Sequence, residues 1–553
     1  TIPNIHSAYT VTDKADGIRK LLYVGQKGKI YMIDINMNVQ YTGLITKDNE
    51  YYNSVLDGEH IIHDKHGKYL NLYTCFDLYF KKGEDYRYYP LIYRDNLSFD
   101  DKKYNTGLSR LEVLNKFVKG MTILSIVKDK KPSMDIKVKT FYSNRNAKNE
   151  EISLFRSCKE LLDGMEDGSM FDYETDGLIF TPIDKSVGSS KLGVLEYQKT
   201  WKYSFKWKPP QYNTVDFLII TKKTETGRDK INHIFQDGTD MVGSNSQLLQ
   251  YKTIELRVGF NPSQHGFINP CQDVIDGNYP DNITYDNRQY KPVPFFPTEP
   301  SPNFNVHLCN IPLLDGNMFI EDKTEAFQDK TIVEFKYVKS NEKYWQWIPI
   351  RVRHDKTADY RSGNKNFGNA YHVANGVWKS IHNPITRDML SGKGLFDLEN
   401  SEVYYKQSTT ETSTRSLRDF HNKYVKQLLI TRASKNKDTL IDMSVGRAGD
   451  MWKWYQSKLE FVVGFDLSKM NLENRKDGAC ARYLKFKSKH RNAPSCLFIT
   501  ADSGHNLRNG DGILEPKGKK IMDAIIGKGS KDKDVLGKVV YENHGVGRDG
   551  FDV

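Results

Sequence analysis

The sequence predicts a multidomain protein in which an α+β domain is followed by a β-barrel and then by part of a doubly wound α/β domain. Three observations predict this fold class. Short β-branched and aromatic runs, separated by Gly, Asn and Asp turns, fill residues 1–221. Similar runs resume in residues 222–386. After residue 416, a strand, a glycine-containing turn, a helix and a second strand follow one another.

Length and composition fit several globular domains. The 553 residues are 38% hydrophobic and 12% aromatic, which supplies enough apolar surface for packed cores. The net charge of +11 is a diffuse basic surplus, compatible with a polyanionic partner. We find no apolar run of the roughly 18 residues that a membrane span needs, so we exclude membrane insertion. Six scattered cysteines without a CxxC pair argue against a zinc ribbon or a disulfide scaffold and indicate a reducing compartment.

The first domain, 1–221, is expected to be mainly antiparallel. Strands are predicted at Leu21–Val24, Ile30–Ile35, His60–His63, Leu70–Leu78, Leu178–Thr181 and Val215–Thr221. Helices are predicted at Ser109–Lys119, where apolar residues recur at helical spacing, and at Glu150–Gly164.

The second domain, 222–386, is expected to be a small barrel that carries a long insertion. Its strands are predicted at Thr253–Gly259, Thr331–Val338 and Trp345–Arg353, and a Pro- and Asn-rich excursion runs from Asn261 to Asn305. A stretch rich in Ser, Thr, Lys and Glu, 387–415, has the composition of a linker.

The third domain, 416–553, is expected to begin with an amphipathic helix at Ser416–Ile430. Its strands are predicted at Thr439–Val445, Phe461–Leu467 and Cys496–Ala501, with a helix at Asp450–Lys458 between the first two. This order implies parallel strands. The chain starts at Thr1 and ends where a further strand is expected, which indicates an excerpt of a longer polypeptide.

A lysine motif near the start carries the first chemical signal. Lys14 stands in the run K-A-D-G-I-R on a predicted turn, and a lysine amine becomes a nucleophile when neighbouring cations lower its pKa. Residues suited to nucleotidyl transfer follow in order: Glu59, Phe76, Asp176, Lys206, Lys208 and Asp216. The carboxylates of Glu59 and Asp176 can hold Mg²⁺ or Mn²⁺, the two lysines can neutralise phosphates, and Phe76 can stack on a base.

This order of motifs resembles the covalent nucleotidyltransferase superfamily of mRNA capping guanylyltransferases and polynucleotide ligases. The resemblance implies that Lys14 attacks GTP to give a Lys14–GMP intermediate, which then passes GMP to a diphosphate-ended RNA. It also implies that Arg19 binds the ribose and that Asp216 orients the lysines of its own segment. Residues Arg353, Asp355 and Lys356 resemble the R-x-D-K element of the capping-enzyme OB-fold domain, which favours guanylyl transfer over an ATP-dependent ligase.

A second signal lies in the third domain. Residues 440–450 read L-I-D-M-S-V-G-R-A-G-D, a strand that runs into a glycine-containing turn, and Asp466 ends the next strand, where an acid can accept ribose hydroxyls. The turn lacks G-x-G-x-x-G, because Ser444 and Ala448 stand where glycines are expected. This favours an S-adenosylmethionine site over a dinucleotide site.

The wider run from Leu417 resembles cap guanine-N7 methyltransferases, although His421 replaces an asparagine of that family. The resemblance implies S-adenosylmethionine contacts from Lys426, Asp442, Gly446, Asp450, Asp466 and Asp502. It implies cap contacts from His421 and Asn422. Because the expected remainder of the cap pocket lies beyond Val553, we expect this domain to be incomplete as it stands.

Taken together, the motifs resemble the multifunctional capping enzymes of large cytoplasmic DNA viruses. This implies a nucleotidyltransferase domain, an OB-fold domain and a partial Rossmann-like methyltransferase domain, acting on GTP and on RNA with 5′-diphosphate or triphosphate ends. A triphosphatase domain or subunit and the transcription machinery are candidate partners, and the host cytoplasm or the virion is the implied location. Two alternatives stay open: a ligase that forms an AMP adduct, and a non-catalytic subunit that only holds RNA.

Overall fold

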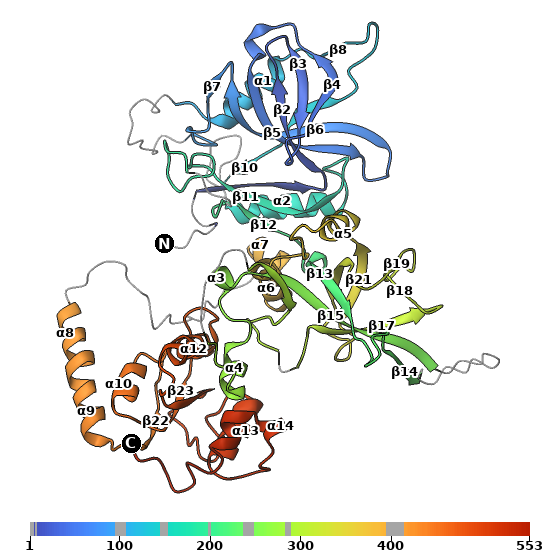
Figure 1. Ribbon diagram of the computed structural model, residues 1–553. Coiled ribbons are helices and arrows are strands. Elements are labelled where there is room, and N and C mark those ends of the chain that lie inside the picture. Colours follow the sequence, from blue (N-terminus) through green and yellow to red (C-terminus); the bar gives the residue numbers. More distant parts are fainter. Residues whose placement is uncertain are drawn as a thin grey trace. The chain divides into compact units, whose positions relative to one another are not determined.

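The structure is a computed structural model that describes residues 5, 8–93, 107–143, 153–196, 201–235, 248–281, 289–302, 304–393 and 414–553 (Figure 1). The chain forms two compact units. Unit 1 comprises Thr1–Asn213 and Asn383–Leu398, and unit 2 comprises Thr214–His382 and Glu399–Val553. Across the described ranges, no helix is long and apolar enough to cross a membrane.

Unit 1 contains two sheets. The larger has the strand order β7-β6-β5-β2-β3-β4-β8, with β9 parallel to β6, and the smaller has the order β10-β1-β11-β12. The strands of the larger sheet are β2 (Ile18–Val24), β3 (Lys29–Ile33), β4 (Val39–Ile45), β5 (Ser54–His63), β6 (Tyr69–Lys81), β7 (Glu84–Asp85), β8 (Leu124–Ser125) and β9 (Asp135–Val138). Those of the smaller sheet are β1 (Tyr9–Ala15), β10 (Tyr142–Ser143), β11 (Thr175–Pro182) and β12 (Phe205–Trp207).

Each sheet of unit 1 is covered by one helix. α1 (Arg110–Gly120) starts at the N-cap Ser109 and packs Leu114 and Phe117 against the larger sheet. α2 (Leu154–Glu166) packs Leu161 and its neighbours against β1 and β11 of the smaller sheet. Both predicted helices of the first domain are thus confirmed over the described residues. Short helical turns occur at η1 (Asn49–Tyr51), η3 (Pro210–Tyr212) and α7 (Arg387–Leu390).

The first residues of the predicted linker at 387–415 form structure. They form α7, and Arg387 makes ion pairs with Asp163 and Glu166 of α2, so this end of the segment packs within unit 1. Residues 394–413 lie outside the described residues.

Unit 2 begins with an antiparallel sheet of nine strands. The order is β19-β18-β17-β15-β13-β20-β21, and β14 and β16 also pair with the long strand β15. The strands are β13 (Thr214–Thr221), β14 (Ile231–Phe235), β15 (Leu248–Phe260), β16 (Lys291–Pro294), β17 (Leu308–Leu314), β18 (Asn317–Phe319), β19 (Ala326–Phe327), β20 (Ile332–Tyr337) and β21 (Trp347–Val352). The sheet includes β13, which the sequence placed in the first domain, and the boundary between units falls between Asn213 and Thr214.

Helices accompany this sheet. They are α3 (Pro262–His265), α4 (Pro270–Asp276), α5 (His354–Arg361) and α6 (Tyr371–His382). α6 packs Tyr371, Ala374 and Trp378 into the aromatic core of the sheet.

The third part of the chain holds a parallel sheet of order β22-β23-β24, as the sequence predicted. Its elements are α8 (Arg415–Phe420), the π-helical turn η4 (His421–Val425), α9 (Lys426–Ala433), β22 (Thr439–Asp442), α10 (Met451–Gln456), β23 (Phe461–Asp466), α11 (Lys469–Glu473), α12 (Ala479–Lys489), β24 (Ser495–Thr500), α13 (Pro516–Ile525), α14 (Lys533–Leu536) and α15 (Lys538–Glu542). Val553 exchanges backbone hydrogen bonds with Thr439 and Ile441 of β22. The predicted helix at Ser416–Ile430 forms, but Leu417, Phe420 and Leu429 on it are exposed.

The insertion predicted in the barrel belongs to the core of the α/β part. Val274 and Ile275 of α4 are buried among residues of the parallel sheet and its helices. Cys271 of α4 forms a disulfide with Cys480 of α12, with 5.2 Å between their Cα atoms. The sequence argued against a disulfide scaffold because the six cysteines are scattered without a CxxC pair, and it did not foresee this single disulfide between residues 209 positions apart. The other four cysteines are free and buried.

We predict that removing one partner from the buried pair of Arg110 and Asp77 strongly destabilises unit 1. Arg110 Nε lies 2.7 Å from Asp77 Oδ1, the arginine side chain is 0% exposed, and burial raises the pKa of Asp77. Arg110→Met leaves a buried carboxylate without its cation, which is expected to lower the free energy of unfolding by about 3 kcal/mol. Urea unfolding followed by circular dichroism measures this change.

The matched control is Arg156→Met on α2, because Arg156 pairs with Glu160 on the surface. We expect a change below about 0.5 kcal/mol for this control. An equally small loss in Arg110→Met would show that the buried pair does not stabilise the fold.

Candidate active sites

The predicted nucleophile lies at an irregularity between two paired strands. β1 and β11 are antiparallel, and their register shifts between Asp13 and Ala15, so Lys14 lies opposite a β-bulge formed by Asp176 and Gly177 of β11. Its Nζ donates to Asp176 Oδ1, and the other oxygen of Asp176 lies 2.6 Å from Lys208 Nζ. The structure therefore brings together three of the predicted residues around one carboxylate.

Two glycines permit this close packing. Gly177 has a φ of +149°, and a Cβ there would lie 1.9 Å from the carbonyl oxygen of Trp207. A Cβ on Gly17 would lie 2.7 Å from Glu59 Cγ. Close packing therefore explains the glycine of each D-G pair, because a side chain at Gly17 or Gly177 would displace the neighbouring strand residues.

Glu59, a predicted metal ligand, lies close to several lysines. It stands on β5 opposite Arg19 of β2. Burial raises the pKa of Glu59 above its ordinary value, and Lys139, Lys14 and Lys206 oppose this shift by stabilising the carboxylate. These three lysines are therefore close enough to act on the Glu59 charge.

A buried network beneath Lys14 was missed by the sequence analysis. Lys139 Nζ lies 2.9 Å from Asp13 Oδ2, and both side chains are 2% exposed. Lys139 also donates to the Asp13 carbonyl oxygen at 3.0 Å, and Tyr173 Oη donates to Asp13 Oδ2 at 3.1 Å. No motif signalled these residues, because they are far apart in sequence and meet only after β1, β11 and the segment after β9 have packed.

Arg19 and Phe76 lie on the larger sheet. Arg19 Nε donates to Asp57 Oδ1 at 3.0 Å, Tyr79 Oη donates to Asp57 Oδ2 at 2.5 Å, and the Asp57 contact raises the pKa of Arg19. Phe76 is half-buried and falls at the register shift between Asp57 and Gly58, where β5 and β6 do not pair regularly.

The predicted R-x-D-K element is held by Asp216 within unit 2. Arg353 Nη1 lies 2.7 Å and Lys356 Nζ 2.5 Å from the same Asp216 oxygen. Asp355 is 72% exposed and lies 3.6 Å from Arg353 Nε. The sequence assigned Asp216 to the lysines of its own segment, whereas the ion pairs that it makes in the structure join it to Arg353 and Lys356.

The carboxylates permit a metal ion only in company with a nucleotide. In the part of the chain that the structure describes, no cluster of three or more His, Cys, Asp or Glu side chains could hold a metal ion. Both Asp176 oxygens already contact ammonium groups, so Glu59 is the carboxylate better placed to receive a cation. Mg²⁺ at nucleotides commonly uses one or two carboxylates plus phosphate oxygens, which these residues fit.

The predicted S-adenosylmethionine residues gather at the carboxyl edge of the parallel sheet. Lys426 Nζ lies 3.0 Å from Asp450 Oδ2, and Lys453 pairs with the other oxygen of Asp450. Burial raises the pKa of Asp442, and the neighbouring Asp450 and Asp466 add to the shift. The three carboxylates therefore lie close to one another.

The turn after β22 is pinned by Asp466. The backbone N–H of Gly446 donates to Asp466 Oδ2 at 2.8 Å, and Ser468 N–H donates to the other oxygen. Ala448, which stands where glycine was expected, adopts a φ of +52°. A glycine is expected at this position because a positive φ favours glycine, and Ala448 adopts that conformation instead.

The remaining predicted residues are more exposed. Asp502 Oδ1 accepts from Gly504 N–H at 2.8 Å, and Asp502 Oδ2 lies 3.2 Å from His505 Nδ1. The predicted cap residues His421 and Asn422 are exposed on the π-helical turn η4. π-helical turns inside α-helices frequently occur at functional sites.

Two segments of the chain match known protein families. Residues 5–210 match the mRNA capping enzyme catalytic domain, and residues 399–519 match the mRNA (guanine-N(7))-methyltransferase domain. The chain therefore carries the guanylyltransferase and guanine-N7 methyltransferase domains of an mRNA capping enzyme, which are transferase domains. The resemblance seen in the sequence is confirmed, and the ligase alternative is not favoured.

Curated relatives agree with this assignment. A probable mRNA-capping enzyme of Acanthamoeba polyphaga mimivirus is 28% identical over 91% of this chain and 42% of its own length. An mRNA-capping enzyme of African swine fever virus is 23% identical over 83% of this chain and 43% of its own length. An mRNA-capping enzyme of Danio rerio is 28% identical over 39% of this chain. The chain thus spans less than half the length of these viral relatives.

We predict that Glu59→Gln stabilises unit 1 near neutral pH. Burial raises the pKa of Glu59 above its unfolded value, so keeping the carboxylate charged in the folded state costs stability above the raised pKa. This cost disappears as the pH falls and the side chain is protonated in both states. Gln removes the charge, so the free energy of unfolding should rise by no more than about 1 kcal/mol at pH 7 after solvent screening. The gain should shrink towards pH 4.

Urea unfolding at both pH values measures the effect. Glu225→Gln, in an exposed turn, is the control and should change nothing. A loss of stability in Glu59→Gln at pH 7 would mean that the lysines around Glu59 outweigh its burial.

Proposed function

We propose that this chain forms the mRNA 5′ cap by guanylyl transfer and supplies part of a guanine-N7 methyltransferase. The observation that carries the proposal is Lys14 at a bulge, in contact with the carboxylate that Lys208 also contacts, inside a capping enzyme catalytic domain. On this proposal the first unit has the nucleotidyltransferase fold, the nine-stranded sheet is the OB-fold domain, and the parallel sheet is a Rossmann-like methyltransferase core.

In the first step, Lys14 Nζ attacks the α-phosphorus of GTP. The new N–P bond forms as the α–β phosphoanhydride bond breaks, pyrophosphate leaves, and the lysine loses its proton to solvent. Lys206 and Lys208 neutralise phosphate oxygens, and Arg19 binds the ribose with its guanidinium held by Asp57. Phe76 stacks on the guanine. Glu59, with Asp176, would hold the metal ion, whose chemistry is to neutralise charge on the phosphates.

In the second step, a terminal phosphate oxygen of a diphosphate-ended RNA attacks the phosphorus of the Lys14–GMP adduct. The N–P bond breaks, Lys14 recovers its proton, and the product carries a 5′–5′ triphosphate. Asp176 receives the regenerated ammonium group, since its contact with Lys14 is already formed in the free chain. Positioning and charge neutralisation suffice for this type of transfer, so no separate general base is invoked.

Arg353 and Lys356 are proposed to neutralise the departing pyrophosphate. Asp216 holds both cations through one oxygen, and Asp355 lies beside Arg353. We propose that Asp216 positions the two side chains for the phosphates, since one of its oxygens contacts both cations.

The methyl donor is proposed to be S-adenosylmethionine. Asp466 would accept the ribose hydroxyls, Asp442 and Asp450 would contact the methionine end together with Lys426, and Asp502 would face the adenine. Gly446 lets the donor approach the turn closely. His421 and Asn422 would contact the cap. The RNA end, a triphosphatase, the transcription machinery and a cytoplasmic or virion location are proposed from the viral relatives.

The proposed guanylyl transfer predicts a covalent nucleotide adduct. With Mg²⁺ and α-labelled GTP, the chain should retain label through denaturing electrophoresis, and Lys14→Ala should abolish it because the N–P bond can no longer form. Lys27→Ala, in an exposed turn, is the matched control and should label normally. An adduct with ATP but not GTP would turn the proposal towards a ligase, and persistent labelling of Lys14→Ala would exclude Lys14 as the nucleophile.

The second prediction concerns the methyl donor. Asp466→Asn removes a charged acceptor, so the Kd for S-adenosylmethionine in isothermal titration calorimetry should rise by about tenfold or more. Asp549→Asn, on an exposed turn, should leave it unchanged. Equal affinities in the two variants would remove Asp466 from the proposed donor site.

A further inference from the structure

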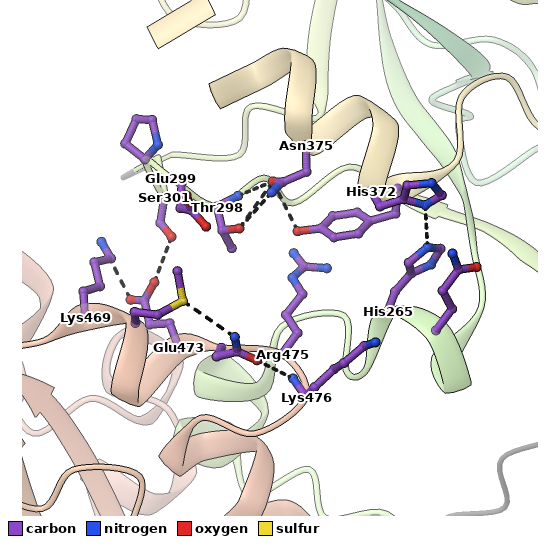
Figure 2. A pocket seen from close by; sticks show the side chains of 15 residues that line it. His265, Thr298, Glu299, Ser301, His372, Asn375, Lys469, Glu473, Arg475 and Lys476 are labelled. Carbon is purple, nitrogen blue, oxygen red and sulfur yellow. Dashed lines mark hydrogen bonds and ion pairs between the residues drawn. The ribbon is translucent and has the colours of Figure 1, made fainter. Parts of the chain in front are cut away.

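A pocket of about 570 Å³ lies within unit 2. α6 and α3 form one wall, and α11 with the turn that follows it forms the other (Figure 2). The cavity volume falls in the range of small-molecule sites. None of its lining residues was assigned a role by the sequence motifs.

A buried arginine lies at the centre of this pocket. Arg475 is 8% exposed, and its guanidinium carbon lies 4.0 Å from the centroid of the Tyr371 ring. One terminal nitrogen donates to the carbonyl oxygen of Phe296, whereas the buried Nε has no hydrogen-bond partner among the described residues. Figure 2 shows the side chain between the wall that carries Asn375 and the wall that carries Glu473. Burial lowers the pKa of Arg475, and Tyr371 and the charge of Glu473 oppose this shift only in part, so an anion in contact with the guanidinium would stabilise the arginine.

A second cation and a histidine pair adjoin Arg475. Lys476 is exposed. Burial lowers the pKa of His265 to about 4, and the neighbouring His372, Lys476 and Arg475 add to this shift. Asn261 N–H donates to His265 Nδ1 at 3.0 Å, so the proton of the neutral ring is on Nε2. That Nε2 lies 3.0 Å from His372 Nδ1, which accepts it. The neutral ring of His265 therefore adds no charge to this wall of the pocket.

The two acidic side chains of the pocket already have cations. Glu299 pairs with Lys379, and Glu473 lies 3.7 Å from Lys469 and accepts from Ser301 Oγ at 2.8 Å. Neither carboxylate forms an ion pair with Arg475 among the described residues. The pocket thus keeps an excess of positive charge at Arg475 and Lys476.

The two walls are also tied together. Phe267 N–H donates to the Arg475 carbonyl oxygen at 3.0 Å, and the Cys271–Cys480 disulfide joins the segments that follow each wall. Arg475 is therefore held in place before any ligand arrives, which lowers the entropy that binding must supply.

We propose that this pocket binds a phosphate group, with Arg475 and Lys476 as its ligands. The phosphate can come from a free diphosphate or nucleotide, or from the backbone of RNA, since both present the same oxygens to a guanidinium and an ammonium group. None of the residues proposed for the nucleotidyl and methyl-donor sites lines this pocket.

The test uses the full chain with Lys206→Ala and Lys208→Ala, which weakens phosphate binding at the proposed nucleotidyl site. Isothermal titration calorimetry with pyrophosphate at low salt should show binding. Adding Lys476→Glu or Arg475→Gln should weaken it by about tenfold or more, because each removes a charge-assisted contact. Lys520→Glu, an exposed lysine on α13, is the matched control and should change the affinity less than about twofold.

Circular dichroism checks the folding of Arg475→Gln, and Lys476→Glu keeps the test valid if that variant unfolds, because Lys476 is exposed. A second arm uses a short 5′-hydroxyl RNA. Displacement of pyrophosphate by this RNA, lost in Lys476→Glu, assigns the phosphate to RNA, whereas displacement by GDP alone assigns it to a free nucleotide. Absence of any Lys476-dependent binding of pyrophosphate and RNA alike would overturn the proposal.

Discussion

The contact between Lys14 and Asp176 is the interaction on which the rest of the first site depends. A lysine in a regular strand alternates with its neighbours, and its amine would follow the pleat. At the bulge, Asp176 and Gly177 of β11 oppose Lys14 of β1, and the amine of Lys14 contacts Asp176. The pairing of β12 with β11 then brings Lys208 to the same carboxylate. One local irregularity in a small sheet thus assembles residues separated by more than 160 positions.

The charged residues around this contact form two groups, one at the surface of the site and one buried beneath it. At the surface of the site, Glu59 and Asp176 lie among Lys14, Lys206 and Lys208. Beneath it, the buried pair of Asp13 and Lys139 carries its own compensation. A buried ion pair costs desolvation energy and contributes little net stability. The structural role of this pair is therefore to hold β1 against the segment that follows β9 and carries Lys139. Such preorganised charge needs no rearrangement when phosphate charge develops.

Much of this architecture could be predicted from local sequence, and the rest could not for physical reasons. The motif lysines and acids, the strands of both sheets in unit 1 and the parallel β22–β24 sheet have short-range patterns. Lys139 and Tyr173 have none, because a buried ion pair is defined by strands that meet in space. The ion pairs of Asp216 with Arg353 and Lys356 had no local signal either, because these partners arrive from 137 and 140 residues away. The disulfide was missed for the same reason.

The insertion that the sequence assigned to the barrel explains why unit 2 is one body. Its helix α4 buries Val274 and Ile275 in the two cores of the α/β part, while β16 returns to pair with β15 of the nine-stranded sheet. Hydrophobic burial at one end and backbone pairing at the other make the insertion a shared element of both folds. Sequence periodicity could not reveal this, because the apolar residues of α4 pack in the α/β part whereas Val293 of β16 packs in the core of the nine-stranded sheet. The pocket around Arg475 exists only because this segment joins the two folds, so its lining residues come from both.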